Sequence, residues 1–168
     1  MASPTPDFYS LLETLSKYQV DFIIVGGVCG VLHGAPVTTF DLDIVHSRTQ
    51  ENLVRLLSAL RELDAYFRGR QDQRLKPKQD HLSSPGHQLL MTRFGPLDLL
   101  GTIGTGWSYE DLLEHSDEIK IGKMRLRVLS LEKLIEVKEE LGSEKDKAIL
   151  PILRQTLLEK QKRRGKKK

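Results

Sequence analysis

Cysteine is almost missing from this chain of 168 residues, because Cys29 is the single one. One cysteine cannot form an intramolecular disulfide or a thiolate zinc cluster, and it favours a reducing, cytoplasmic setting. The chain also lacks a run of about 18 apolar residues, which argues against a membrane span. Its first residues, MASPTPDF, lack the basic and apolar segments of a secretory signal. We therefore expect a cytoplasmic protein with no membrane attachment and one modest core.

Positive charge is concentrated at the C-terminal end. The chain holds 26 Lys and Arg against 23 Asp and Glu, yet the segment KQKRRGKKK (160–168) holds seven basic groups and no acid. The rest of the chain is therefore mildly acidic. We expect a folded domain over residues 1–159 and a basic disordered tail over residues 160–168. Such a tail either holds RNA through counterion release or only keeps the chain in solution.

Apolar periodicity predicts α and β elements mixed along the chain. Helices are expected at 7–18, 27–34, 50–63, 109–114, 130–141 and from about 145 into the tail; strands at 20–25 and 40–46; hairpins at 88–101 and 118–129. The polar, turn-rich segment 68–87 is expected to be a mobile loop. These elements predict an α/β (α+β) fold in which helices flank a short mixed β-sheet.

The segment FDLDIV (40–45) places two carboxylates on one side of a predicted strand. Side chains alternate along a strand, so Asp41 and Asp43 point the same way and repel each other unless a cation lies between them. A strand that runs into Gly26-Gly27 and then a helix exposes backbone N–H groups where phosphate binds well. Magnesium prefers carboxylate oxygens and bridges them to substrate phosphates. The segment thus predicts a site for Mg²⁺ or Mn²⁺ and a phosphate group.

The ordered motifs VGG, TFDLDI and PLDLL resemble the signature of the DNA polymerase β-like nucleotidyltransferase superfamily. Within it, the HG pair after VGG, the block from Thr92 to Leu100, RVLSLEKLIEVK and the pair Lys145-Asp146 are similar to small bacterial nucleotidyltransferases related to the AbiEii and MenT toxins. The resemblance covers roughly residues 20–155. It implies a nucleotidyltransferase fold with a two-metal site.

Site residues follow from this resemblance. It implies that Asp41, Asp43 and Asp98 hold the metal ions, and that Asp98 also helps to deprotonate an attacking hydroxyl. It implies that Gly26 and Gly27 hold the nucleotide phosphates, with Thr39 as a hydroxyl partner beside them. In the alternative interpretation, Asp98 is only a carboxylate that faces solvent at the end of a strand. Thr39 is then only one of the β-branched residues that are common in strands.

A lysine and an aspartate complete the set of predicted site residues. The apolar stripe of SLEKLIEVKEEL continues at helical spacing to Lys138, and an inward charge must meet an anion or extend to water. The resemblance implies that Lys138 binds nucleotide phosphate and that Asp146 has a supporting or catalytic-acid role. Two alternatives remain open: Lys138 merely extends to water, and Asp146 merely caps the last helix or pairs with a neighbouring residue.

Two departures from the related toxins remove positive charge. Relatives often have arginine four residues before the first aspartate, where this chain has Val37, and a basic residue where it has Ser143-Glu144. Four arginines are candidates to compensate: Arg48, Arg68, Arg70 and Arg93.

The sequence predicts a magnesium-dependent nucleotidyltransferase that moves a nucleoside monophosphate from an NTP to a hydroxyl of tRNA, other RNA or protein and releases pyrophosphate. The main alternative is a non-catalytic nucleotide sensor or toxin–antitoxin component of the same fold. An RNA-binding module driven by the tail is a third class, which the acidic body disfavours.

Overall fold

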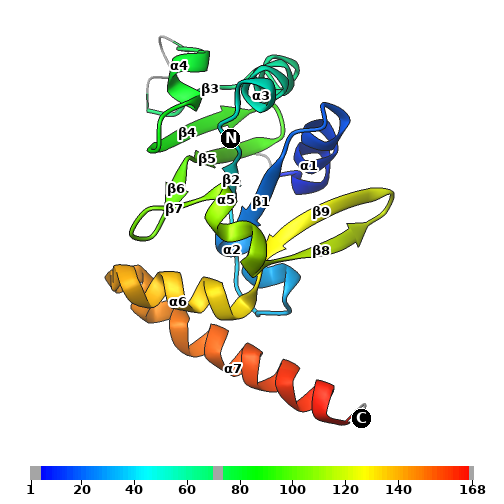
Figure 1. Cartoon of the computed structure of the whole chain (residues 1–168), viewed down its shortest axis with the longest axis vertical. Coiled ribbons are helices and arrows are strands. Elements are labelled where there is room, and N and C mark those ends of the chain that lie inside the picture. The colour runs from blue at the N-terminus through cyan, green and yellow to red at the C-terminus, as the bar shows by residue number, and fades with distance from the viewer. Residues whose placement is uncertain (1–4, 70–73, 167–168) are drawn as a thin grey trace.

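The computed structural model of the chain describes residues 5–69 and 74–166 (Figure 1). Its main sheet has seven strands in the order β3-β4-β5-β2-β1-β9-β8. The strands are β1 (Phe22–Val25), β2 (Leu42–His46), β3 (Tyr66–Phe67), β4 (His87–Thr92), β5 (Gly95–Leu100), β8 (Ser116–Ile121) and β9 (Met124–Leu129). The pairs β1–β9 and β2–β5 are parallel and the others antiparallel, so the sheet is mixed as predicted.

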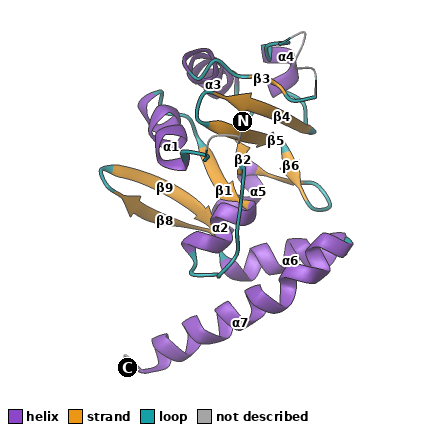
Figure 2. Cartoon of the chain, turned by 180° about the vertical axis from the view of Figure 1, so that it is seen from behind, coloured by secondary structure: helices purple, strands orange, loops and turns teal. Residues whose placement is uncertain are grey.

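Helices lie around this sheet on both sides (Figures 1 and 2). They are α1 (Phe8–Lys17), α2 (Gly26–Leu32), α3 (Gln50–Glu62), α4 (Gln79–Leu82), α5 (Tyr109–Leu112), α6 (Leu131–Leu141) and α7 (Glu144–Lys166), with a 3-10 turn at Leu113–His115. The leucines predicted as stripes, such as Leu11, Leu15, Leu56 and Leu60, are buried. They pack with apolar strand residues in one continuous core, because that arrangement removes the most apolar area from water.

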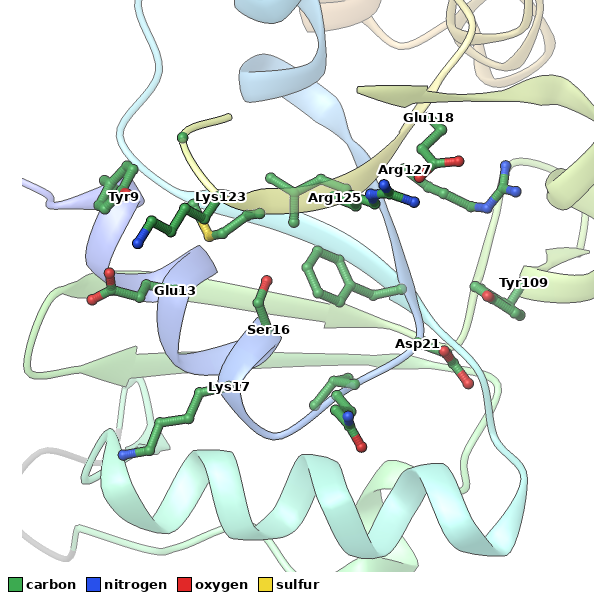
Figure 3. Close-up of a pocket in the computed structure, with 16 residues that line it drawn as sticks. Tyr9, Glu13, Ser16, Lys17, Asp21, Tyr109, Glu118, Lys123, Arg125 and Arg127 are labelled. Atoms are coloured by element: carbon green, nitrogen blue, oxygen red, sulfur yellow. The ribbon is translucent and has the colours of Figure 1, made fainter. Parts of the chain in front are cut away.

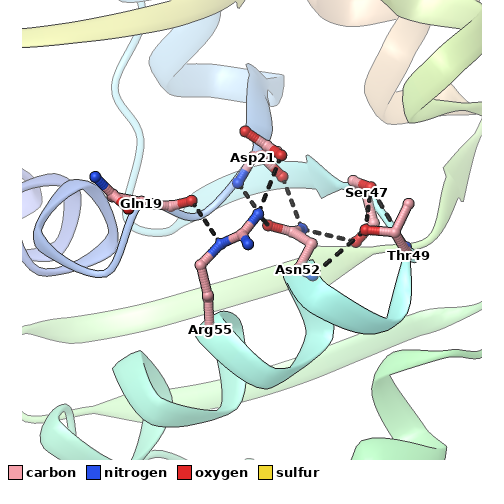
Figure 4. Close-up of polar contacts among 6 residues, drawn as sticks. All are labelled: Gln19, Asp21, Ser47, Thr49, Asn52 and Arg55. Atoms are coloured by element: carbon pink, nitrogen blue, oxygen red, sulfur yellow. Dashed lines mark hydrogen bonds and ion pairs between the residues drawn. The ribbon is translucent and has the colours of Figure 1, made fainter.

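A buried amide joins α3 to the two central strands (Figure 4). Asn52 is fully buried; its Nδ2 donates to the backbone oxygens of Asp21 (3.1 Å) and Ser47 (2.7 Å), and its Oδ1 accepts from the backbone N–H of Asp21 (2.7 Å). Thr49 caps α3 by accepting the backbone N–H of Asn52 at 3.3 Å. Because Asp21 precedes β1 and Ser47 follows β2, this one side chain fixes the antiparallel pair at the end opposite Gly26.

The segment 68–87 differs from the mobile loop that we predicted. Residues 79–82 form α4, in which Leu82 is fully buried and its backbone oxygen contacts Nε2 of His46 at 2.8 Å. Burial of one leucine and this backbone contact hold the segment against the domain, although its polar composition hides them. Residues 70–73 lie outside the described residues.

Three short strands also went unpredicted. One is β3 at the edge of the main sheet, and the other two, β6 (Thr102–Ile103) and β7 (Trp107–Ser108), form a separate hairpin against α6. Trp107 Nε1 donates to Glu140 at 3.2 Å, and the ammonium of the buried Lys133 lies 3.4 Å from the centre of the indole ring. Two-residue strands leave too little pattern to be recognised in a sequence.

The C-terminal helix departs from the disordered tail expected for residues 160–168. Helix α7 continues through Lys166, and Figure 1 shows its second half extending beyond the other elements. Lys, Arg and Gln are good helix formers, so a helix already begun at Glu144 can continue through them. Residues 167–168 lie outside the described residues. Within the described ranges, no helix combines the length and the apolar composition needed to cross a membrane.

Candidate metal and nucleotide site

Three carboxylates converge where β2 and β5 lie side by side. Asp43 on β2 is the direct register partner of Asp98 on β5, and Asp41 immediately precedes β2. One oxygen from each of Asp41, Asp43 and Asp98 can be chosen so that all lie within 4.8 Å of one another. We call these three residues the carboxylate cluster. The structure therefore brings together the three predicted metal ligands, although more than fifty positions separate Asp43 from Asp98 in sequence.

The glycine turn borders the carboxylate cluster directly. Val25 is the register partner of Asp43, so the next residue, Gly26, begins α2 beside that carboxylate. Gly26 has φ of +70°, and a Cβ there would lie 2.9 Å from Cβ and Cγ of Asp43. A Cβ on Gly27 would lie 2.5 Å from Oγ1 of Thr39. Both glycines thus permit an approach of backbone to side chain that no other residue allows.

Burial and mutual repulsion make the cluster unfavourable without a cation. Burial, followed by repulsion from Asp41 and Asp98, raises the pKa of Asp43 to about 8. Burial and repulsion from Asp98 also raise the pKa of Asp41, while Arg68 and Lys145 oppose that change. Among the described residues, the buried Oδ1 of Asp43 has no hydrogen-bond partner.

A hard divalent ion fits this donor set. All three side chains offer oxygen ligands, which Mg²⁺ and Mn²⁺ prefer. A cation would offset the repulsion between the carboxylates and would bind the unpaired oxygen of Asp43. The arrangement can hold a metal ion next to the glycine turn that begins α2.

Thr39 lies beside the glycine turn, but its hydroxyl is already engaged. Its Oγ1 donates to the backbone oxygen of Asp41 at 3.1 Å and lies against Gly27. The contact holds the segment before β2 in a fixed path towards the cluster. Thr39 is therefore close enough to the site for the predicted role, and in this structure it supports the backbone of Asp41 rather than a carboxylate.

Arg68 supplies the positive charge that the sequence could not place. Its Nη1 donates to Oδ1 of Asp98 at 2.7 Å and to the backbone oxygen of Leu90 at 2.8 Å. The other candidates fare differently: Arg48 donates to the backbone oxygen of Ser83, and Arg70 lies outside the described residues. Arg93 is exposed in the turn between β4 and β5. No local pattern distinguishes Arg68, because its contact with Asp98 depends on the pairing of β3 with β4 and of β4 with β5.

Lys138 and Asp146 form a shielded ion pair between α6 and α7. Lys138 Nζ lies 3.2 Å from Oδ1 of Asp146, and the two side chains are 19% and 14% exposed. Ser143 donates its hydroxyl to Oδ2 of Asp146 at 2.6 Å. Burial raises the pKa of Asp146, but the hydrogen bonds from Ser143 and Lys138 together lower it below its usual range. The positive charge of Lys138 partly offsets the rise in the pKa of Asp43, so the ion pair lies near the carboxylate cluster.

His33 has a structural role at the end of α2. Its Nε2 donates to the backbone oxygen of Leu129 at 2.7 Å, while its Nδ1 accepts from Lys160 Nζ at 2.7 Å. Both ring nitrogens are therefore engaged in the neutral tautomer, and burial lowers the pKa of the ring. The contact joins α7 to the helix that begins at the glycine turn.

A separate cavity lies away from the carboxylate cluster. It has a volume of about 960 Å³ and opens between α1 and β9 (Figure 3). Tyr9, Glu13 and Lys17 line it from α1, and Arg125 and Arg127 from β9. None of the predicted site residues lines this cavity. Its mixed charges carry no specific chemistry, so the carboxylate cluster remains the candidate site.

No protein-family model matches the sequence, and no curated protein matches it. A solved structure does match: a protein of Thermotoga maritima, provisionally named as a nucleotidyltransferase, aligns over 90% of this chain and 91% of its own. The two sequences are 20% identical, and the TM-score is 0.54. At that identity the likeness shows the fold alone. The predicted nucleotidyltransferase fold, a mixed sheet flanked by helices, is confirmed.

Proposed function

We propose that this protein is a metal-dependent nucleotidyltransferase, related to the small AbiEii and MenT toxin-type enzymes. The observation that carries the proposal is the carboxylate cluster directly beside the glycine turn at Gly26-Gly27. In the reaction, a hydroxyl oxygen of the acceptor forms a bond to the α-phosphorus of an NTP. The bond to the bridging oxygen of the β-phosphate breaks, and pyrophosphate leaves.

Each residue has a defined task in this proposal. Asp41 and Asp43 hold Mg²⁺ or Mn²⁺ with the triphosphate, and Asp98 completes the metal site and takes the proton from the acceptor hydroxyl. Gly26 and Gly27 offer their backbone N–H groups to the nucleotide phosphates. Bound metal would stabilise the charge that develops on the entering and leaving oxygens.

The remaining predicted residues act around this centre. Lys138, which lies near the cluster in an ion pair with Asp146, meets a phosphate of the nucleotide, and Asp146 has the supporting role of pairing with Lys138 while no nucleotide is bound. Its lowered pKa keeps Asp146 ionised, which argues against the catalytic-acid role. Thr39 holds the backbone of Asp41 in place. The proposed acceptor is tRNA, another RNA or a protein in the cytoplasm, and a toxin–antitoxin partner is part of the same proposal.

A second candidate is a nucleotide sensor of the same fold, which binds an NTP without transferring it. The observation in its favour is the ion pair between Arg68 and Asp98, which occupies the carboxylate that the enzyme needs as a base. In this case Asp41 and Asp43 suffice to hold one metal ion with the triphosphate.

Asp98→Asn separates the two candidates. The substitution keeps the shape of the side chain and removes its charge, so we expect NTP affinity within a few-fold of wild type and transfer lower by about 10² or more. The measurements are calorimetry for NTP binding and a gel assay for transfer of labelled nucleotide to a mixture of tRNA and cell protein. Asp80→Asn, at an exposed position on α4, is the matched control. Unchanged transfer in Asp98→Asn would remove that residue from the mechanism, and no transfer by the wild type would favour the sensor.

A further inference from the structure

Arg68 lies at the boundary between the carboxylate cluster and strand β4. Its backbone N–H donates to the oxygen of Leu89 at 3.0 Å, and its Nη1 donates to the oxygen of Leu90 at 2.8 Å. Arg68 directly follows β3, which pairs with β4, and Leu89 on β4 is the register partner of Asp98 on β5, so the arginine lies one strand away from the carboxylate. Two backbone contacts therefore position the guanidinium before any contact with Asp98 is considered.

The guanidinium takes one of the two oxygens that Asp98 offers. The distance from Nη1 to Oδ1 is 2.7 Å, and the side chains of Arg68 and Asp98 are only 28% and 11% exposed. A charge-assisted contact at this distance, shielded from water, is stronger than a surface ion pair. A metal ion that used Oδ1 of Asp98 would have to displace it.

Formal charge decides how many ions this arrangement accepts. Metal ligands must be ionised, so the three carboxylates and the guanidinium that contacts them carry a charge of −2. Lys145 and the ion-paired Lys138 act on the same carboxylates and make the surroundings less negative still. One divalent ion neutralises that charge. A second ion would meet a net positive site and a carboxylate already in use, until a triphosphate contributes its own negative charge.

We infer that Arg68 is the internal counter-ion of Asp98, which limits the protein without nucleotide to one divalent ion and opens the Asp98 position only when a triphosphate is bound. This inference rests on the proposed function, because it concerns the regulation of the same metal site. Arg68 is here a positioning residue that acts through Asp98.

Titration with Mn²⁺ alone, followed by electron paramagnetic resonance of the free ion, tests this role. Arg68→Gln removes the charge and should bind Mn²⁺ at least about fivefold more tightly than wild type, with a second ion detectable. Arg68→Lys keeps the charge and should remain close to wild type. Arg93→Gln removes an exposed arginine from the neighbouring turn and controls for net charge.

A thermal readout separates this role from a merely structural one. Without metal, Arg68→Gln should melt below wild type, because three carboxylates then lack their counter-ion. Saturating Mn²⁺ should raise the melting temperature of Arg68→Gln by more than it raises that of wild type, because bound metal replaces the missing charge. If Mn²⁺ leaves the difference in melting temperature between Arg68→Gln and wild type unchanged, the inference is overturned.

The outcomes distinguish this inference from the proposed function. Equal or weaker Mn²⁺ binding in Arg68→Gln, with binding still lost in Asp43→Asn, would overturn the role of Arg68 alone. Binding that does not depend on Asp43 would overturn the metal site itself and both proposals with it. Should Arg68→Gln not fold, wild type provides the test: one Mn²⁺ alone and two with a non-hydrolysable NTP analogue support the inference. Two equally tight ions without nucleotide overturn it.

Discussion

Gly26 and Asp43 occupy positions that leave no room for a side chain at residue 26. Gly26 adopts φ of +70°, and a Cβ there would overlap the carboxylate of Asp43. Register explains the proximity, because Val25 pairs with Asp43 and the chain turns into α2 directly afterwards. The glycine turn and the metal ligand are therefore one structural unit rather than two neighbouring motifs.

Gly26→Ala should damage both folding and metal binding. A residue with a Cβ at positive φ is strained by about 1–2 kcal/mol, and overlap with Asp43 adds to that cost. Gly34→Ala is the matched control, since Gly34 has φ of +97° and nothing within 4 Å of its added Cβ. We expect Gly26→Ala to lower the free energy of unfolding by more than Gly34→Ala and to lose Mn²⁺ binding. If urea denaturation shows that both variants lose the same free energy of unfolding, the overlap with Asp43 adds nothing to the cost of the substitution.

The stability of the metal-free protein should depend on the ionisation of Asp43. An acid whose pKa rises on folding stabilises the folded state in its protonated form. Its contribution is complete below the ordinary Asp pKa of 3.8 and is lost as the pH rises towards about 8. At pH 8.5 without metal, Asp43→Asn should therefore be more stable than wild type by about 1–3 kcal/mol, with a smaller difference at pH 5.

Added Mg²⁺ should reverse the order at pH 8.5, because wild type then gains an ion that the amide cannot hold. Urea denaturation at the two pH values, with and without Mg²⁺, measures all four cases. Asp80→Asn should show neither effect. A wild type whose stability is flat between pH 5 and pH 8.5 would contradict the environment described for Asp43.

Substitutions of Lys138 and of Asp146 should have different effects on nucleotide binding. Lys138→Met removes the proposed phosphate ligand and leaves Asp146 shielded without its cation, so NTP affinity should fall by about tenfold or more and stability should fall too. Asp146→Asn frees Lys138 for phosphate, so NTP affinity should stay within a few-fold of wild type. Calorimetry on both variants decides the matter. If both lose affinity equally, the pair acts as a unit and Lys138 has no direct contact with the nucleotide.

The basic end of α7 should bind RNA independently of the carboxylate cluster. Deleting residues 161–168 removes six basic residues and retains Lys160, which holds His33. We expect unchanged NTP binding, weaker RNA association and a shallower dependence of RNA affinity on salt. A variant with Lys162, Arg163 and Arg164 all changed to Gln should behave similarly while keeping the helix length. RNA affinity and salt slope identical to wild type would show that this segment serves solubility only.

The local elements of this protein are determined by its sequence. Apolar spacing predicted α1, α3 and α6, and alternation predicted the hairpins β4–β5 and β8–β9, because each pattern reports which face of one element is buried. The carboxylate cluster was also predicted, since Asp41, Asp43 and Asp98 lie in recognisable motifs. Sequence spacing even predicted that Lys138 faces inward. The helices and hairpins need only a few consecutive residues, whereas the meeting of Asp98 with Asp41 and Asp43 was implied by the family resemblance.

Tertiary structure alone decided the partners of the charged groups. Arg68 reaches Asp98 because β4 pairs with both β3 and β5. Lys138 meets Asp146 because α6 packs on α7, and Lys160 meets His33 across 127 positions. These contacts join residues that no local period relates, and a side chain of one charge in a sequence does not indicate which opposite charge the fold places beside it. Strand register and helix packing fix those distances, and with them the electrostatics of the carboxylate cluster.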